Sequence, residues 1–182
     1  GFALRCAGRL LLRHAAQAPC LFVGQGRERM DMYRGNFDIE DYVEERTALR
    51  HLAITQEEQG ALLAFARHPG DAPQLVLRVQ AQPHGVHLVL QHAAPGWNRL
   101  WLRLPAEHDE HVWGCGEQMS YFDLRGRHFP LWTSEPGVGR DKSTHLTWQA
   151  DVTARSGGDY YHTNYPQPSF ISSQRYCLHA ET

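Results

Sequence analysis

Long apolar runs are scarce in this chain of 182 residues, and their scarcity limits the classes of protein it can belong to. The leucine run Leu10–Leu12 has basic residues on both sides, and even the six apolar residues 61–66 fall far short of the about 20 that a helix needs to span a bilayer. Lysine is scarce as well, because Lys142 is the one lysine among 18 basic residues. Against 20 acidic residues the formal net charge is −2, which argues against a polyanion as the main partner. We therefore expect neither a membrane span nor nucleic-acid binding.

Cysteine is rare, with four residues at Cys6, Cys20, Cys115 and Cys177. No two of them form a Cys-x-x-Cys pair, so a zinc knuckle or a thioredoxin-type site is not predicted. The chain begins at Gly1 without the charged and apolar segments of a signal peptide. We therefore expect reduced cysteines, a cytoplasmic location and a longer parent polypeptide.

Short runs with period-two alternation are abundant, and this pattern is typical of strands with one buried face. Residues 75–80 and 86–91 alternate on either side of the turn-forming Gln82–Gly85, which predicts a hairpin. Residues 56–65 are interpreted as a turn leading into a strand. Further strands are expected at 9–14, 20–23, 30–34, 51–55, 100–104, 129–133, 145–150, 160–165 and 170–177. Turns rich in Gly and Pro separate these runs, so the sequence predicts an all-β, antiparallel β-sandwich that forms one domain over residues 1–182.

Two pairs of acidic residues are candidates for a glycosidase site, namely Glu117 with Asp123 and Glu135 with Asp141. Such a site needs two carboxyl groups about 5–5.5 Å apart for retention of configuration, or about 6.5–9.5 Å apart for inversion. Sequence spacing establishes neither distance. The alternative interpretation is that these carboxylates cap turns and bind arginines.

The glycines that flank Cys115 indicate a bulge or a close approach of two backbone segments. As a nucleophile, Cys115 would need a neighbouring base and a site that stabilises the thiolate. The sequence locates neither, so a buried structural cysteine is the preferred interpretation.

Twelve histidines are present, and His84/His87 and His108/His111 are pairs with i, i+3 spacing. Such a pair can bind one metal ion only where the chain turns between its two members. On a strand, residues i and i+3 point to opposite faces. No third ligand stands at a diagnostic spacing, and residues 107–110 are interpreted as a solvated acidic loop. We therefore predict no metal site and no cofactor.

Aromatic residues suit either sugar stacking or a core, and a core position is the preferred interpretation for Trp113, Trp132 and Trp148. The other aromatic candidates are Trp97, Trp101, Tyr160, Tyr161 and Tyr165. The loop over residues 135–142 carries glycines and charges of both signs. Loops of this kind at one end of a sandwich often carry function.

The stretch from Trp113 to Phe170 contains a dense series of motifs. Trp113–Gln118 is followed by Ser120–Gly126 and by Phe129–Glu135, then by shorter motifs at 137–140, 147–151, 157–161 and 166–168. Upstream, residues 20–24 and 31–37 continue the series. Together these segments resemble the amino-terminal domain of glycoside hydrolase family 31 enzymes, and within that family the branch of bacterial sulfoquinovosidases.

This resemblance implies a galactose-mutarotase-like β-sandwich that packs on a catalytic (β/α)₈ barrel of the same polypeptide. In the family the barrel supplies both catalytic aspartates and the groups that recognise the sugar. This chain ends before such a barrel begins, so none of its residues is predicted to be catalytic, and Glu117 and Asp123 are predicted to be structural. The chain alone is expected to be inactive, as the accessory domain of a retaining α-glycosidase that hydrolyses α-sulfoquinovosides.

The resemblance also implies a loop that reaches over the mouth of the barrel and helps to wall the substrate pocket. Position and composition favour the loop over residues 135–142 for this role. Its candidate residues are Glu135, Gly137, Gly139, Arg140 and Lys142.

Two other functions remain open at the level of sequence. A free-standing carbohydrate-binding module would need a flat or grooved set of exposed tryptophans. An aldose mutarotase would need a histidine base and a carboxylate that converge in a cleft, with His145 and His162 as candidates for the base. Fold analogy alone supports the mutarotase.

Overall fold

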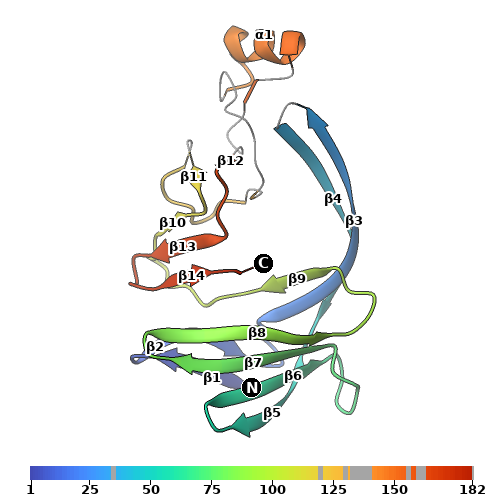
Figure 1. Cartoon of the computed structure of the whole chain (residues 1–182), viewed down its shortest axis with the longest axis vertical. Coiled ribbons are helices and arrows are strands. Elements are labelled where there is room, and N and C mark those ends of the chain that lie inside the picture. The colour runs from blue at the N-terminus through green and yellow to red at the C-terminus, as the bar shows by residue number, and fades with distance from the viewer. Residues whose placement is uncertain are drawn as a thin grey trace. The chain divides into compact units, whose positions relative to one another are not determined.

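The structure, a computed structural model, describes residues 1–33, 36–118, 121–128, 131, 141–154, 157–158 and 163–181. These residues form many short strands and a single helix (Figure 1). The strand pairings are antiparallel, and the described residues contain no (β/α)₈ barrel. The predicted all-β, antiparallel sandwich class is therefore confirmed.

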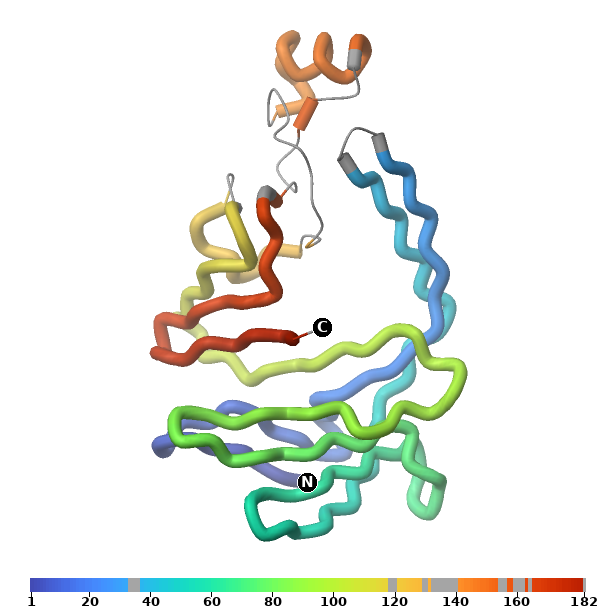
Figure 2. The backbone as a smooth tube through the Cα atoms, viewed as in Figure 1, coloured from blue at the N-terminus to red at the C-terminus, as the bar shows by residue number. Residues whose placement is uncertain are grey.

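The contacts divide the chain into two compact units. The first unit contains Gly1–Glu28 and Asp41–Ala106, and the second contains Arg29–Glu40 and Glu107–Thr182. Figure 2 traces the backbone from blue at the N-terminus to red at the C-terminus. That residues 1–182 act as one domain of a larger glycosidase stays a prediction.

The first unit is built mainly from hairpins. A four-stranded sheet has the order β5-β6-β7-β8, formed by β5 (His51–Glu57), β6 (Gly60–Ala66), β7 (Leu75–Gln82) and β8 (Gly85–Ala93). Gln82 pairs with Gly85, so the predicted hairpin at this turn is confirmed. β1 (Phe2–Cys6) and β2 (Arg9–His14) form a second hairpin. Its two loop residues, Ala7 and Gly8, have φ values of 48° and 80°, as a tight hairpin turn requires.

A third sheet has the order β4-β3-β9, formed by β4 (Asn36–Ala48), β3 (Leu21–Tyr33) and β9 (Arg99–Leu102). The expected strands at 20–23 and 30–34 both fall largely within the long strand β3. The sequence did not predict β4, because charged side chains interrupt the alternation of apolar residues along it. Charged side chains are a common way to keep an edge strand from pairing with another molecule.

The core of the first unit joins side chains from several of these strands. Its buried members are Leu12, Cys20, Leu21, Val23, Leu49, Leu63, Phe65, Leu75 and Leu77. They come from β2, β3, β6 and β7 and from the positions beside β3 and β4, so the hairpins and the four-stranded sheet share one apolar interior. Complete burial of each such side chain contributes about 1.5–3 kcal/mol.

One polar pair is enclosed in this apolar interior. The Nδ1 atom of His14 lies 3.6 Å from the Sγ atom of Cys20, and the ring of His14 contacts Phe65 edge-on at 5.2 Å. Nε2 lies 3.3 Å from the carbonyl oxygen of Arg50. Burial lowers the pKa of His14 and raises the pKa of Cys20 to about 11. Both groups are therefore neutral at pH 7, and Cys20 is a structural thiol.

The second unit has shorter strands. β10 (Val112–Gly114), β13 (Ser169–Ser172) and β14 (Cys177–His179) form a sheet in the order β10-β13-β14, and β11 (Glu117–Gln118) pairs with β12 (Thr163–Asn164). The strand expected at 170–177 is thus two strands joined by a turn. Of the strand expected at 129–133 the structure describes residue 131 alone, and of the strand expected at 160–165 it describes residues 163–165, which include β12.

The unit also contains the helix α1 (His145–Ala154), so the strand expected at 145–150 is wrong. Thr144 supplies the N-cap, since its hydroxyl oxygen accepts a hydrogen bond from the backbone N–H of Thr147 at 3.3 Å. The backbone N–H of Trp148 in turn donates to the carbonyl oxygen of Thr144 at 3.0 Å. Capping satisfies donors at the start of a helix, and here it outweighs a short alternation of apolar residues.

Candidate functional site

The family motif at residues 114–116 forms a tight turn in the second unit. Gly114, Cys115 and Gly116 have φ values of 119°, 62° and 97°, respectively. A Cβ atom on Gly116 would lie 2.5 Å from the carbonyl oxygen of Tyr165, and one on Gly114 would lie 2.8 Å from that of Ser169. The close backbone approach that these glycines predicted is therefore confirmed.

A pocket of about 430 Å³ lies beside this turn. Its wall combines aromatic rings with a few polar groups, the composition that small-molecule sites commonly show. Burial raises the pKa of the Cys115 thiol, so Cys115 has no thiolate character at pH 7. The lining residues are Trp113, Gly114, Cys115, Gly116, Glu117, Tyr165, Gln167, Ser169, Phe170, Ile171 and Cys177.

Asp123 caps the turn that follows this segment. One carboxylate oxygen accepts hydrogen bonds from the backbone N–H groups of Val112 and Arg125, at 3.2 and 3.1 Å. The other lies 2.6 Å from Nδ1 of His111. The hydrogen bond with His111, followed by that from Arg125, lowers the pKa of Asp123 to about 2. These contacts are those of a structural carboxylate, which agrees with the interpretation preferred from sequence.

Glu117 has different surroundings from Asp123, because it lies on β11 and lines the pocket. Of the other proposed pair, Glu135 lies outside the described residues. Asp141 accepts hydrogen bonds from the backbone N–H and the hydroxyl of Ser143, at 2.9 and 2.6 Å. Its contacts are therefore also those of a turn-capping residue.

A buried carboxylate that sequence reasoning missed lies in the same unit. Glu110 is only 4% exposed, so the solvated loop expected at 107–110 is wrong for this residue. It accepts hydrogen bonds from the hydroxyls of Ser172 and Tyr176, at 2.5 and 2.8 Å, and from the backbone N–H of Glu107 at 3.0 Å. Burial alone would raise the pKa of Glu110, but these hydrogen bonds outweigh it and lower the pKa. Burial and the contact with Glu110 raise the pKa of Tyr176 to about 12.

Four of the five candidate loop residues, Glu135, Gly137, Gly139 and Arg140, lie outside the described residues. The fifth, Lys142, is described. Its Nζ atom lies 2.8 Å from a carboxylate oxygen of Asp151 on α1 and 3.2 Å from the carbonyl oxygen of Gly157. Lys142 thus joins the start of the helical segment to the chain that follows it, and its proximity to a substrate stays a prediction.

The histidine and tryptophan candidates have mixed outcomes. His145 begins α1, and its ring lies 5.6 Å from that of Trp148 at an interplanar angle of 39°, whereas His162 and Trp132 lie outside the described residues. Trp148 is 56% exposed, so its predicted core position is wrong. Trp113 is half-buried and stacks against His111 at 6.0 Å.

Within the described residues, no three His, Cys, Asp or Glu side chains are placed to hold a metal ion together. The same residues include no helix that is long and apolar enough to cross a membrane.

These features place the chain among all-β sandwich domains with an aromatic-lined pocket beside a glycine turn. No family model matches it. Proteins named sulfoquinovosidase from Agrobacterium fabrum and Escherichia coli are 56% and 48% identical to it, over 100% and 99% of its length. The chain spans about a quarter (26%) of the length of each.

A solved structure described as a family 31 sulfoquinovosidase from E. rectale, in complex with the aza-sugar inhibitor IFGSQ, superposes with a TM-score of 0.88. It is 43% identical, and the match covers 99% of this chain and 26% of that chain. The predicted resemblance is therefore confirmed. The chain matches the amino-terminal part of sulfoquinovosidases of glycoside hydrolase family 31.

Proposed function

We propose that this chain is the accessory domain of a retaining α-glycosidase that hydrolyses α-sulfoquinovosides. The observation that carries the proposal is the match, over the whole length of this chain, to proteins named sulfoquinovosidase. The chain spans about a quarter of the length of those proteins. In this proposal a catalytic barrel of the same polypeptide supplies two aspartates, one as the nucleophile and one as the acid/base, and the reaction passes through a covalent glycosyl-enzyme.

The contacts of the acidic residues in this chain support the assignment of the catalytic carboxylates to the barrel. Asp123 and Glu110 are both engaged in hydrogen bonds within their own unit. Glu110 is also buried, whereas a catalytic carboxylate needs a face open to the substrate. The proposed role of the chain is therefore structural support and one wall of the active site.

Exposed apolar side chains support packing against a further domain. Trp148 and Val152 stand four residues apart on one face of α1 and are 56% and 66% exposed. Phe122 and Tyr165, also in the second unit, are 83% and 77% exposed. Large apolar side chains of this kind commonly mark an interface, and the proposed occupant is the barrel.

The proposed contribution to the active site is the loop over residues 135–142. Its role is to close the pocket and to hold the substrate in position rather than to break a bond. The contacts of Lys142 with Asp151 and Gly157 support a fixed position for the end of this loop. None of the four cysteines, all of which are described, forms a disulfide bond, and this supports the proposed cytoplasmic location.

The test compares the full-length polypeptide with residues 1–182 alone, using a chromogenic α-sulfoquinovoside and the matching α-glucoside. We expect the full-length protein to prefer the sulfonated substrate and the isolated chain to be inactive. In the full-length protein, Arg140→Ala should raise KM more than it lowers kcat, and His128→Ala, a substitution outside the loop, should change neither. Turnover by residues 1–182 alone would refute the accessory role.

One observation favours a second function, a carbohydrate-binding module. The pocket of the second unit is lined by Trp113, Tyr165 and Phe170 together with the polar Glu117 and Gln167. Flat rings stack on the apolar faces of sugars. Calorimetry on residues 1–182 would detect binding of sulfoquinovosides or glucosides, and Trp113→Ala should abolish it while Trp148→Ala should not. The absence of heat with every sugar would exclude this function.

A further inference from the structure

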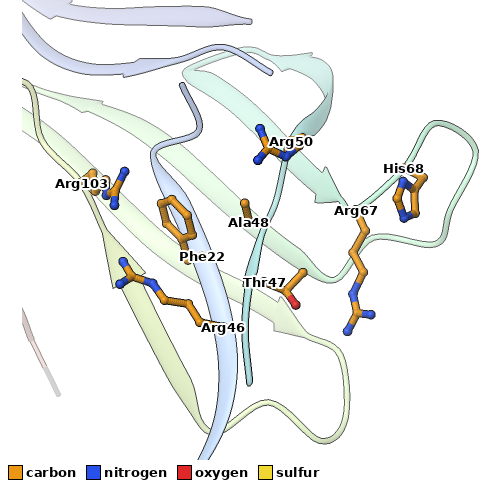
Figure 3. A pocket seen from close by; sticks show the side chains of 8 residues that line it. All are labelled: Phe22, Arg46, Thr47, Ala48, Arg50, Arg67, His68 and Arg103. Atoms are coloured by element: carbon orange, nitrogen blue, oxygen red, sulfur yellow. The ribbon is translucent and has the colours of Figure 1, made fainter. Parts of the chain in front are cut away.

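A second pocket, of about 580 Å³, lies in the first unit and has no part in the proposed function (Figure 3). Four of its eight lining residues are arginines. The residues are Phe22, Arg46, Thr47, Ala48, Arg50, Arg67, His68 and Arg103. A formal net charge of −2 for the whole chain gives no indication of this local concentration of positive charge.

Two of the arginines are held against the same aromatic ring. The guanidinium carbons of Arg46 and Arg103 lie 4.7 and 4.5 Å from the centre of the Phe22 ring. Arg46 also lies 4.7 Å from the ring centre of Trp101, the residue that pairs with Phe22 between β9 and β3. Figure 3 shows both guanidinium groups beside Phe22. Contacts with ring faces orient a guanidinium group without neutralising its charge.

The other two arginines have polar partners. Arg50 donates a hydrogen bond to the carbonyl oxygen of Ala16 at 2.8 Å. Arg67 lies 3.5 Å from a carboxylate oxygen of Glu45 and stacks on Trp97 at 4.7 Å. Its Nε atom is buried and has no hydrogen-bond partner within the part of the chain that the structure describes.

Within those same described residues, neither Arg46 nor Arg103 forms an ion pair with a carboxylate. The contrast with Arg99 is informative, since Arg99 lies 2.8 Å from Glu28 and 2.9 Å from Asp41. Arg46 and Arg103 are thus two oriented positive charges on one ring, and neither has an ion-pair partner among the residues that the structure describes.

We propose that this pocket binds the sulfate, sulfonate or phosphate group of a small organic anion. Guanidinium groups present parallel N–H donors that match two oxygens of such a group. Arg46 and Arg103 supply these donors, and the charges of Arg50 and Arg67 add to the attraction. Phe22 and Ala48 give the pocket an apolar wall against which the body of the ligand packs, and its volume is in the usual range for a small ligand.

The site does not depend on the accessory role, because all of its residues belong to the first unit. A failure of the glycosidase proposal would leave it unchanged. A failure of anion binding would likewise leave the glycosidase proposal unchanged.

The experiment titrates the natural full-length polypeptide with sodium sulfate, sodium phosphate and sodium methanesulfonate by calorimetry, with ionic strength held constant by sodium chloride. The comparison is between the wild type and the double variant Arg46→Gln/Arg103→Gln. Losing two charge-assisted contacts should weaken binding at this site by at least about tenfold. Subtraction of the two titrations separates this site from any other anion site in the polypeptide.

Arg27→Gln is the matched control, because it removes the same charge from the same unit outside the pocket. It should bind anions as the wild type does. Circular dichroism establishes that each variant is folded, and Arg46→Lys/Arg103→Lys, which keeps both charges, provides a second variant with an expected intermediate affinity. The proposal is overturned if the double glutamine variant binds every anion as the wild type does, or if sulfate, phosphate and methanesulfonate all act no differently from chloride.

Discussion

The unit formed by Gly1–Glu28 and Asp41–Ala106 buries leucine, valine and phenylalanine side chains from several strands. The unit formed by Arg29–Glu40 and Glu107–Thr182 instead buries a carboxylate, two threonines and a serine, namely Glu110, Thr147, Thr163 and Ser172. Among its described residues, Leu124 is the one buried apolar side chain.

The two units therefore differ in the interactions that stabilise them. Apolar burial is non-directional and tolerates small shifts, whereas buried polar groups stabilise a fold only while their hydrogen bonds are complete. The first unit therefore depends mainly on apolar burial for its stability. The second unit should depend more strongly on individual hydrogen bonds, on pH and on packing against a further domain.

The largest expected effect is the loss of an aromatic side chain from the apolar core. Phe65 is fully buried and contacts the rings of Phe2 and His14, so Phe65→Ala should cost about 3–5 kcal/mol in the free energy of unfolding. Urea unfolding measures this loss. Ile54→Ala, at a position 43% exposed, should cost far less, and equal losses at the two positions would contradict the assigned core.

The second effect tests the polar interior of the other unit. Glu110→Ala leaves the hydroxyls of Ser172 and Tyr176 and the backbone N–H of Glu107 without their acceptor. It should cost about 2–4 kcal/mol. Amide hydrogen exchange should show faster exchange in β10 and β13 and little change in β6 and β7. Asp109→Ala at the exposed neighbouring position is the control, and equal effects of both variants would refute the role of the buried carboxylate.

A smaller effect is expected at the glycine turn. Gly116→Ala places a methyl group against the carbonyl oxygen of Tyr165 in a backbone conformation that favours glycine, and should cost about 1–3 kcal/mol. Gly126 also has a positive φ, of 69°, but open space around its Cβ position. Gly126→Ala should therefore cost about 1 kcal/mol, and thermal unfolding of both variants separates steric contact from backbone strain.

The smallest effects are those of pH, and they distinguish the two units. The pKa of His14 is lowered on folding, so its contribution is present above the unfolded pKa of about 6.5 and is lost as pH falls below it. The pKa of Asp123 is lowered to about 2, so its contribution is lost only between about pH 4 and pH 2. Hydrogen exchange measured from pH 7 to pH 3 should show that amides around His14 in the first unit lose protection at a higher pH than amides around Asp123 in the second unit. His14→Phe should remove the pH dependence in the first unit, and Asp123→Asn should remove that in the second.

Much of the fold of the first unit was predictable from sequence, because one face of its strands is buried and the apolar residues alternate accordingly. Strand β2 and the hairpin of β7 and β8 were predicted for this reason. Strand β4 was missed because exposed charged residues fill it, and α1 was missed because its cap at Thr144 is a property of local hydrogen bonds.

The sites were less predictable than the strands. Glycines on both sides of Cys115 marked a close approach of backbones, since few other residues permit it. Nothing in the spacing indicated Glu110, whose partners Ser172 and Tyr176 are 62 and 66 residues away. The arginine pocket was equally hidden, because its members come from separate segments of the chain and become neighbours only in the folded first unit.

The four cysteines differ in exposure, so their reactivity can report on local unfolding of each unit. Cys20 is sealed in the first unit beside His14, while Cys6 in the same unit is half-buried. Cys177 is exposed and Cys115 half-buried in the second unit. A thiol-reactive label should therefore modify Cys177 promptly and Cys20 only when the apolar interior opens. The order in which the four thiols react would time the unfolding of each unit without the introduction of any probe.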